Sequence, residues 1–185
     1  MIKASPLMIA ILTPLFNLIL TSKHFPNQWN FGLIKNIHKG GNKNDPNNYR
    51  GITLNSFLGK LFCTILHQRL SDFCDANDII AKEQAAFRKG YRSTDHIYLL
   101  KTIVKKYIAQ NKRLSICFVD LEKAFDSVWR KGILNKVKKL GIEGNILDII
   151  KSIYDNTTYI VTINDKLTPR YSSTKGINYT AYNYS

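Results

Sequence analysis

The stretch that most constrains the fold is residues 118–129, which read FVDLEKAFDSVW. The apolar run 116–119 is rich in β-branched and aromatic residues, and this predicts a buried strand. Asp120 follows directly, and a carboxylate is costly to bury without a partner. From Ala124 onward the apolar residues fall at helix-like spacing. The chain is therefore expected to run from a strand through a carboxylate and a tight turn into a helix.

Two interpretations of Asp120 follow from the residues alone. An oxygen ligand held at the end of a rigid strand, facing an open site, suits the chemistry of Mg²⁺. In the other interpretation, Asp120 and Asp126 only cap the helix that follows them. The spacing does not decide between a metal ligand and a helix cap.

The charge of the chain favours an anionic polymer as its partner. Lysine and arginine number 27 against 13 acidic residues, which gives a formal net charge of +14. The first acidic residue is Asp45, so the chain before it carries only positive charge. Such an excess points to nucleic acid, although a generally basic surface that keeps the protein in solution would give the same count.

Neither a disulfide framework nor a membrane span is predicted. The cysteines Cys63, Cys74 and Cys117 form no C-x-x-C pair, and their odd number suits a reducing compartment inside the cell, nucleus or cytoplasm. Cys63 and Cys117 lie in apolar runs and are predicted to be core residues. The apolar run 8–20 is too short to span a bilayer, and it is expected to form an amphipathic helix ending near Ser22.

The remaining periodicity predicts a mixture of strands and amphipathic helices. Strands are expected at 31–37, with Leu33 and Ile37 facing inward, and at 49–54, with a loop rich in glycine and asparagine between them. Helices are expected at 56–70, 94–108, 133–140 and 145–154. A linker-like stretch is expected at 71–81, a strand at 159–164, and its hairpin partner at 170–174.

Several of these segments together resemble one family. FVDLEKAFDSV is similar to the first palm motif of reverse transcriptases, in the form used by non-LTR (LINE-like) retrotransposons. The resemblance continues upstream in FPNQWNFGLIKNIHKGGNKNDPNNYRGITL and EQAAFRKGYRSTDHI, and downstream in WRKGILNKVKKLGI and IIKSIY. It runs from residue 15 to residue 176. It implies an α+β, partial right-hand polymerase fold, consisting of the fingers and the N-terminal part of the palm.

The resemblance also implies a division of the chain into four parts. Residues 1–24 would form the N-terminal amphipathic helix, and residues 25–113 a fingers-like region. Residues 114–176 would form a partial palm. The tail 177–185 does not resemble the family.

The resemblance assigns the palm residues to catalysis. Asp120 would ligate Mg²⁺, assisted by the carbonyl of Leu121. Phe125 would be the gate that excludes a ribose 2′-hydroxyl. Asp126 would be a structural cap rather than a metal ligand.

The resemblance assigns the upstream residues to substrates. Arg50, with Lys39, would hold the triphosphate of the incoming deoxynucleotide, a task that suits the planar fork of arginine. Arg88, Gly90 and Arg92 would contact the RNA template, which would be paired with a DNA primer. No membrane partner is implied.

A two-metal centre needs more than one carboxylate. In reverse transcriptases the second and third carboxylates are adjacent aspartates in a later palm hairpin, and no Asp-Asp pair occurs in this sequence. The expectation is therefore a fragment of an RNA-directed DNA polymerase that is inactive alone. A non-catalytic, basic nucleic-acid-binding module and a pseudogene remnant remain alternatives.

Overall fold

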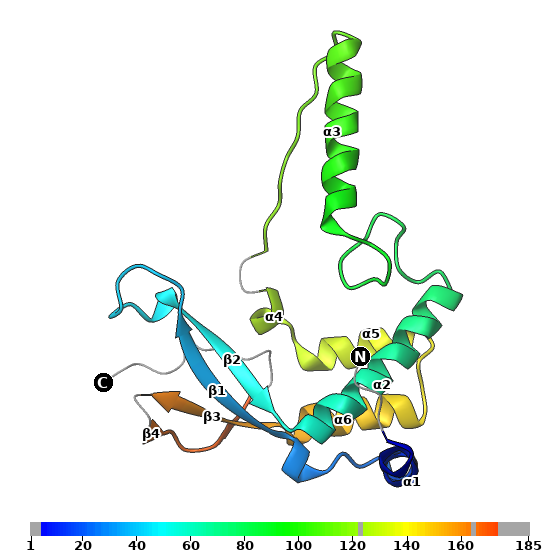
Figure 1. Cartoon of the computed structure of the whole chain (residues 1–185), viewed down its shortest axis with the longest axis vertical. Coiled ribbons are helices and arrows are strands. Elements are labelled where there is room, and N and C mark those ends of the chain that lie inside the picture. Colours follow the sequence, from blue (N-terminus) through cyan, green and yellow to red (C-terminus); the bar gives the residue numbers. More distant parts are fainter. Residues whose placement is uncertain (1–4, 122–123, 164–165, 174–185) are drawn as a thin grey trace. The chain divides into compact units, whose positions relative to one another are not determined.

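The computed structural model describes residues 5–121, 124–163 and 166–173. The chain divides into two compact units, the first made of residues 1–66 and 123–185 and the second of residues 67–122. The first unit holds the β-sheet. The second holds helix α3 and an extended segment, residues 112–121 (Figure 1). The fold is mixed α and β with a small sheet, as the sequence predicted.

The N-terminal helix α1 spans Pro6–Ser22, close to its predicted limits. The Ser5 side chain accepts a hydrogen bond from the Met8 amide at 3.3 Å and caps the helix start. One face of α1 packs into the main core of the first unit. The buried members of that core are Phe16, Ile19, Phe25, Phe62, Leu66 and Ile149.

The predicted helices are all present, with shifted ends. Their bounds are α2 Phe57–Ala76, α3 Ser93–Ala109, α4 Ala124–Ser127, α5 Arg130–Lys139 and α6 Asn145–Asn156. Two short 3-10 helices, η1 Asn27–Trp29 and η2 Pro46–Asn48, lie in the connections. The prediction of a linker at 71–81 is wrong for its first half, because α2 continues through it and keeps Phe73 and Cys74 partly buried.

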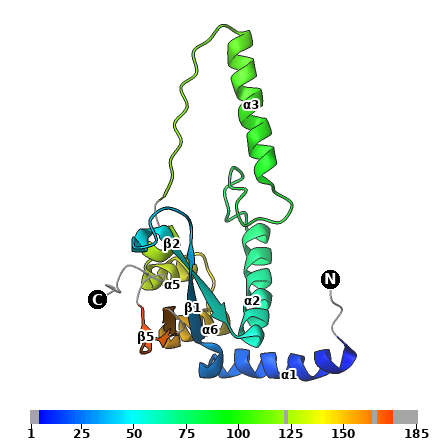
Figure 2. The same cartoon turned by 60° about the vertical axis from the view of Figure 1, so that its left-hand side comes forward.

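The sheet combines strands from the two sequence segments that make up the first unit. Its strands are β1 Phe31–His38, β2 Tyr49–Asn55, β3 Thr158–Ile163, β4 Lys166–Leu167 and β5 Tyr171–Ser172. β1 pairs antiparallel with β2 and parallel with β3, and β3 pairs antiparallel with both β4 and β5. The predicted hairpin partner of β3 is thereby confirmed in β5. Figure 2 shows the β1–β2 hairpin from a second side.

The inward face of β1 is the opposite of the predicted one. Ile34 is fully buried and packs with Tyr159 and Val161, whereas Ile37 is 48% exposed. Side chains alternate between the two faces of a strand, so a shift of one residue exchanges them. The buried face is the one that carries Tyr159, whose hydroxyl is bonded to Arg130 of α5.

The strand predicted at 116–119 is not formed. Residues 112–121 run without regular secondary structure and are exposed, with Phe118 at 80% and Val119 at 82%. A strand exists only where a neighbouring strand completes its hydrogen bonds, and within the described ranges none lies beside this segment. Cys117 and Cys63 are exposed, so their prediction as core residues is wrong. Within the same ranges, no helix is both long and apolar enough to cross a membrane.

Candidate nucleic-acid interface

Arg50 lies on the outward face of the β1–β2 hairpin, and exposed Lys39 directly follows β1. Arg50 is directly opposite Ile37 in the ladder, and the Lys39 amide donates a 2.7 Å hydrogen bond to the Asn48 carbonyl. Lys39 is one residue beyond the end of β1, and its hydrogen bond to Asn48 continues the ladder at the edge of the hairpin. Lys35 lies two residues before Ile37 and adds a second cation to the face of Arg50. All three cationic residues are exposed.

The loop that carries Lys39 is held by its own asparagines and Asp45. The Asn48 side-chain amide donates to the Asn42 carbonyl at 3.0 Å, and the Asn47 amide donates to the Asp45 carboxylate at 2.9 Å. The Tyr49 hydroxyl donates to the Lys43 carbonyl at 2.9 Å. These bonds order the loop, so the ordering costs less when a ligand binds.

The electrostatic character of this hairpin is positive. Its one acidic residue is Asp45, and that carboxylate accepts bonds from both nitrogens of Asn47. Neither Arg50 nor Lys39 forms an ion pair with any residue that the structure describes. The outward face therefore offers unneutralised cations beside the exposed apolar side chains of Ile37 and Ile52.

Arg88 in the second unit is engaged by its own chain. Its guanidinium lies 3.3 Å from the Asp75 carboxylate and donates a 3.3 Å bond to the Ala81 carbonyl. It also lies over the Tyr91 ring, 4.6 Å from the centroid. Its side chain is only 17% exposed. Arg88 therefore braces the basic turn, residues 88–92, against α2 and has little surface left for a ligand.

Gly90 and Arg92 shape the entry to α3. Gly90 has φ +84, a left-handed conformation that side chains with a Cβ rarely adopt. The Arg92 amide donates a 3.1 Å hydrogen bond to the Asp95 carboxylate, and the Arg92 side chain is exposed. Arg92 itself occupies the N-cap position of α3 and Ser93 is its first helical residue.

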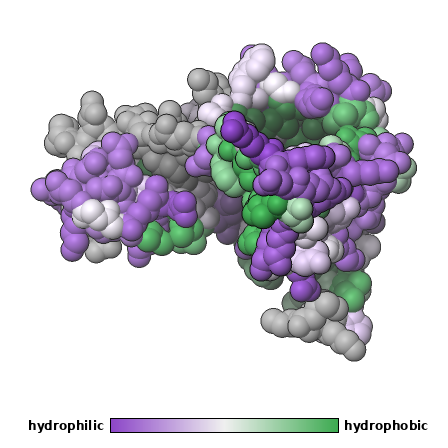
Figure 3. Space-filling view, turned by 90° about the horizontal axis from the view of Figure 1, so that it is seen from above, coloured by the Kyte–Doolittle hydropathy of each residue, from purple (hydrophilic) through white to green (hydrophobic). Residues whose placement is uncertain are grey.

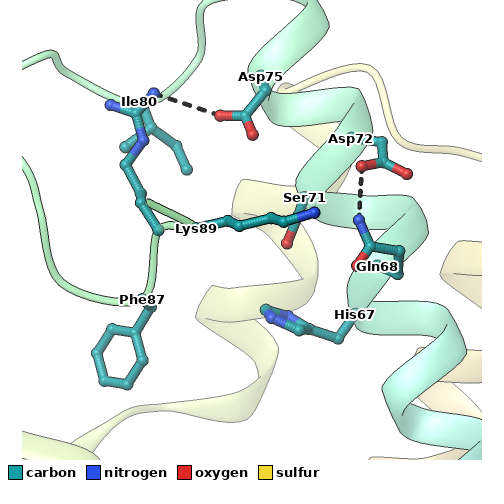
Figure 4. A pocket seen from close by; sticks show the side chains of 9 residues that line it. His67, Gln68, Ser71, Asp72, Asp75, Ile80, Phe87 and Lys89 are labelled. Atoms are coloured by element: carbon teal, nitrogen blue, oxygen red, sulfur yellow. Dashed lines mark hydrogen bonds and ion pairs between the residues drawn. The ribbon is translucent and has the colours of Figure 1, made fainter. Parts of the chain in front are cut away.

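A small pocket of about 130 Å³ lies between α2 and this basic turn. In Figure 4 the Lys89 side chain extends across the pocket toward Ser71, with the His67 ring on the same side of α2. Asp72 accepts a 2.7 Å bond from the Gln68 amide, and Asp75 is engaged by Arg88. Within the part of the chain that the structure describes, Lys89 forms no ion pair.

The palm residues are placed less completely. Asp120 and Leu121 lie at the exposed end of the extended segment, with Leu121 72% exposed. Phe125 and Asp126 fall in α4, but their side chains lie outside what the structure describes. The described residues contain no group of three or more metal-ligating side chains. Asp120 is thus a single carboxylate, and the described residues do not make a two-metal site.

Lys35 was missed as a candidate ligand-binding residue by the sequence analysis. Lys35 could have been found from the two-residue alternation along β1 once the strand was assigned. The direction of the Lys89 side chain, by contrast, depends on how the turn folds back on α2.

The sequence profile of the family described as "Reverse transcriptase (RNA-dependent DNA polymerase)" matches residues 37–177. That range includes the outward hairpin face from Ile37 to Arg50, the basic turn and Asp120. The chain belongs to the reverse transcriptase family. The resemblance inferred from the motifs is thereby confirmed.

Individual reverse transcriptases of non-LTR retrotransposons are similar over most of this chain. The "Probable RNA-directed DNA polymerase from transposon BS" of Drosophila melanogaster is 31% identical over 164 residues, covering 88% of this chain and 18% of the relative. The corresponding X-element protein of the same species is 27% identical, covering 91% of this chain and 19% of the relative. An R2 element polyprotein of Popillia japonica is 32% identical over 142 residues, covering 74% of this chain and 19% of the relative. The chain therefore spans about a fifth of the length of these relatives.

Proposed function

We propose that this chain supplies the fingers and the first part of the palm of a right-hand, RNA-directed DNA polymerase. In this role the β1–β2 hairpin holds the triphosphate of the incoming deoxynucleotide, and the basic turn holds the template strand. The observation that carries the proposal is the outward position of Arg50 on an ordered hairpin, with exposed Lys39 at the end of β1. Both residues lie within the range matched by the family profile.

The chemistry of the hairpin suits a polyphosphate. Arginine donates two parallel hydrogen bonds to phosphate oxygens, and lysine adds a point charge. The cations carry no intramolecular neutralisation among the described residues, so binding a triphosphate does not first require breaking an ion pair. Lys35, on the face of Arg50, would extend this positive strip along β1.

The chemistry of the second unit suits the phosphate backbone of a template. Exposed Lys89 and Arg92 would contact phosphates directly, and such contacts fix position without reading sequence. Arg88 would act by holding the turn in place through Asp75. Gly90 would allow the close approach of the backbone, because it presents no side chain.

The palm contribution would be Asp120, with the Leu121 carbonyl, toward Mg²⁺. One carboxylate cannot hold two metal ions in line. We therefore propose that the 185-residue chain does not synthesise DNA by itself, and that further carboxylates are needed for synthesis. Phe125 would serve as the gate against ribonucleotides.

Nucleotide binding by the full chain tests the proposal. A fluorescent deoxynucleoside triphosphate is titrated in magnesium-free buffer, and anisotropy is measured for the native chain and for R50A. R50A should weaken binding about tenfold or more, which corresponds to a lost charged hydrogen-bonding group of about 1.5–3 kcal/mol. The matched control is R69A, which removes an exposed arginine on α2 and should leave the affinity unchanged.

Equal loss in R50A and R69A would mean that the chain binds nucleotides only through its overall charge. That result would favour the alternative, a non-catalytic basic module that binds nucleic acid without a nucleotide site. The observation behind the alternative is the net charge of +14.

A further inference from the structure

Most backbone N–H and C=O groups of the extended segment from Lys112 to Leu121 form no hydrogen bond with other described residues. The Lys112 amide bonds to the Tyr107 carbonyl at 2.9 Å, and this closes the end of α3. No backbone hydrogen bond within the described residues involves residues 113–121. Every residue of the segment is exposed. An extended chain with free N–H and C=O groups is a template for pairing with another strand.

When the segment pairs as a strand, its side chains alternate between two different faces. One face has an apolar middle with a cation at one end and an anion at the other, and it consists of Lys112, Leu114, Ile116, Phe118 and Asp120. The second face carries Arg113, Ser115, Cys117, Val119 and Leu121. The space-filling view from above shows hydrophobic side chains at the surface among hydrophilic ones (Figure 3). Phe118 at 80% and Ile116 at 45% are among the exposed apolar side chains.

The first face is complementary to itself when it is reversed. In an antiparallel pair with a two-fold axis at Ile116, Ile116 lies opposite Ile116 of the second copy. Leu114 then lies opposite Phe118, and Lys112 lies opposite Asp120. Apolar side chains meet apolar ones and opposite charges meet at both ends, which are the favourable cross-strand pairs of antiparallel sheets.

Neighbouring arrangements lack this match. An axis at Cys117 places Leu114 opposite Asp120, and an axis at Ser115 places Lys112 opposite Phe118. A parallel in-register pair places each Asp120 beside the other Asp120, and like charges directly opposite are destabilising. The charge pattern therefore selects one register.

We propose that two copies of this chain pair through residues 112–120 as antiparallel strands about Ile116. The result is a closed, isologous two-fold contact in which each copy uses the same surface. This inference goes beyond the polymerase assignment, since it does not depend on nucleotide or template binding. It also has a consequence for that assignment, because Asp120 would be paired with Lys112 of the second copy and blocked from a metal ion.

Disulfide cross-linking of the full chain tests the register. In a background of C63S, C74S and C117S, I116C places two thiols directly opposite each other across the two-fold axis. V119C is the matched control, since in this register residue 119 lies opposite Arg113. Val119 is more exposed than Ile116, so random collisions would favour the control. Under mild oxidation I116C should form covalent dimers at least tenfold faster than V119C.

Charge reversal gives the second readout on the same chain without new cysteines. Sedimentation velocity should show a concentration-dependent dimer for the native chain and a weaker dimer for K112D or D120K. The combination K112D/D120K restores the opposite charges and should restore the dimer. Monomers at all concentrations, an open series of larger species, equal cross-linking of I116C and V119C, or a double variant no better than the single ones would overturn the proposal.

Discussion

The Arg130 guanidinium donates a 3.0 Å hydrogen bond to the hydroxyl of Tyr159, and both residues are buried. It donates a second 3.0 Å bond to the Tyr154 carbonyl. The rings of Tyr154 and Tyr159 lie 5.6 Å and 5.9 Å from the guanidinium carbon. No carboxylate among the described residues pairs with this cation. Oxygen acceptors and aromatic faces therefore hold α5, α6 and β3 together at one buried charge.

Replacing Arg130 should destabilise the first unit. R130M keeps most of the apolar volume but leaves the Tyr159 hydroxyl and the Tyr154 carbonyl without this donor, which costs about 1–3 kcal/mol. Urea unfolding followed by circular dichroism measures the loss. K131M, on the exposed neighbouring position of α5, should change the free energy of unfolding by less than about 0.5 kcal/mol. Equal effects of the two variants would contradict a structural role for Arg130.

The stability of the fold should fall at alkaline pH through Tyr154. Burial raises the pKa of the Tyr154 hydroxyl above its ordinary value, the Arg130 cation opposes this, and Tyr159 and Cys63 add to the rise. A raised folded-state pKa means that the unfolded chain ionises first. The contribution of neutral Tyr154 to folding stability is complete below the pKa of the unfolded state, about 10. It is lost as the pH rises through the pKa of the folded state. Unfolding free energies measured across that window should fall less steeply for Y154F than for the native chain, and parallel curves would contradict this assignment.

Gly90 should be required for its backbone conformation rather than for space. A Cβ added there meets nothing within 4 Å, yet φ is +84. G90V should therefore lower the stability of the second unit by about 1–2 kcal/mol, and G90N, whose side chain tolerates the left-handed region, by less. Thermal unfolding of both variants checks the order. A valine variant as stable as the asparagine variant would show that the turn relaxes without cost.

The sequence predicted the helices well because their signals are local. α1 and α6 each carry an apolar stripe at helical spacing, and the structure places them near the expected limits. The family motifs likewise lie within contiguous stretches, so the sequence alone was enough to assign roles to Arg50 and Asp120. Those roles remain predictions.

The errors of the sequence analysis arise where the answer depends on distant residues. Leu33, Ile34 and Ile37 are all apolar, so the pattern could not decide which face of β1 meets Tyr159. The apolar run ending at Val119 has the composition of a strand but finds no neighbour among the described residues. Arg88 was predicted to contact the template, and no local pattern indicated that Asp75 of α2 would be its ion-pair partner.

Nucleic-acid binding should depend on Lys89 and Arg92 more than on Arg88. Each phosphate contact releases counterions. Removing two contacts should therefore reduce the slope of the logarithm of the binding constant against the logarithm of the salt concentration by about two. K89A/R92A should show this change with an RNA–DNA duplex, measured by anisotropy between low and physiological salt. R88A should lower stability and leave the salt slope nearly unchanged, because Arg88 is already paired with Asp75. A larger slope change in R88A would assign the template contact to Arg88 instead.

The central claim, that this chain is the fingers and first palm segment of a reverse transcriptase, is tested most directly by complementation. Residues 1–176 are joined to the remaining palm and thumb of a related element, and primer extension is measured on an RNA template with deoxynucleotides. The chimera should synthesise DNA, and D120N should abolish synthesis while leaving primer–template binding intact, because an amide lacks the charge of a metal-ligating carboxylate. Undiminished DNA synthesis by the D120N chimera would contradict the account.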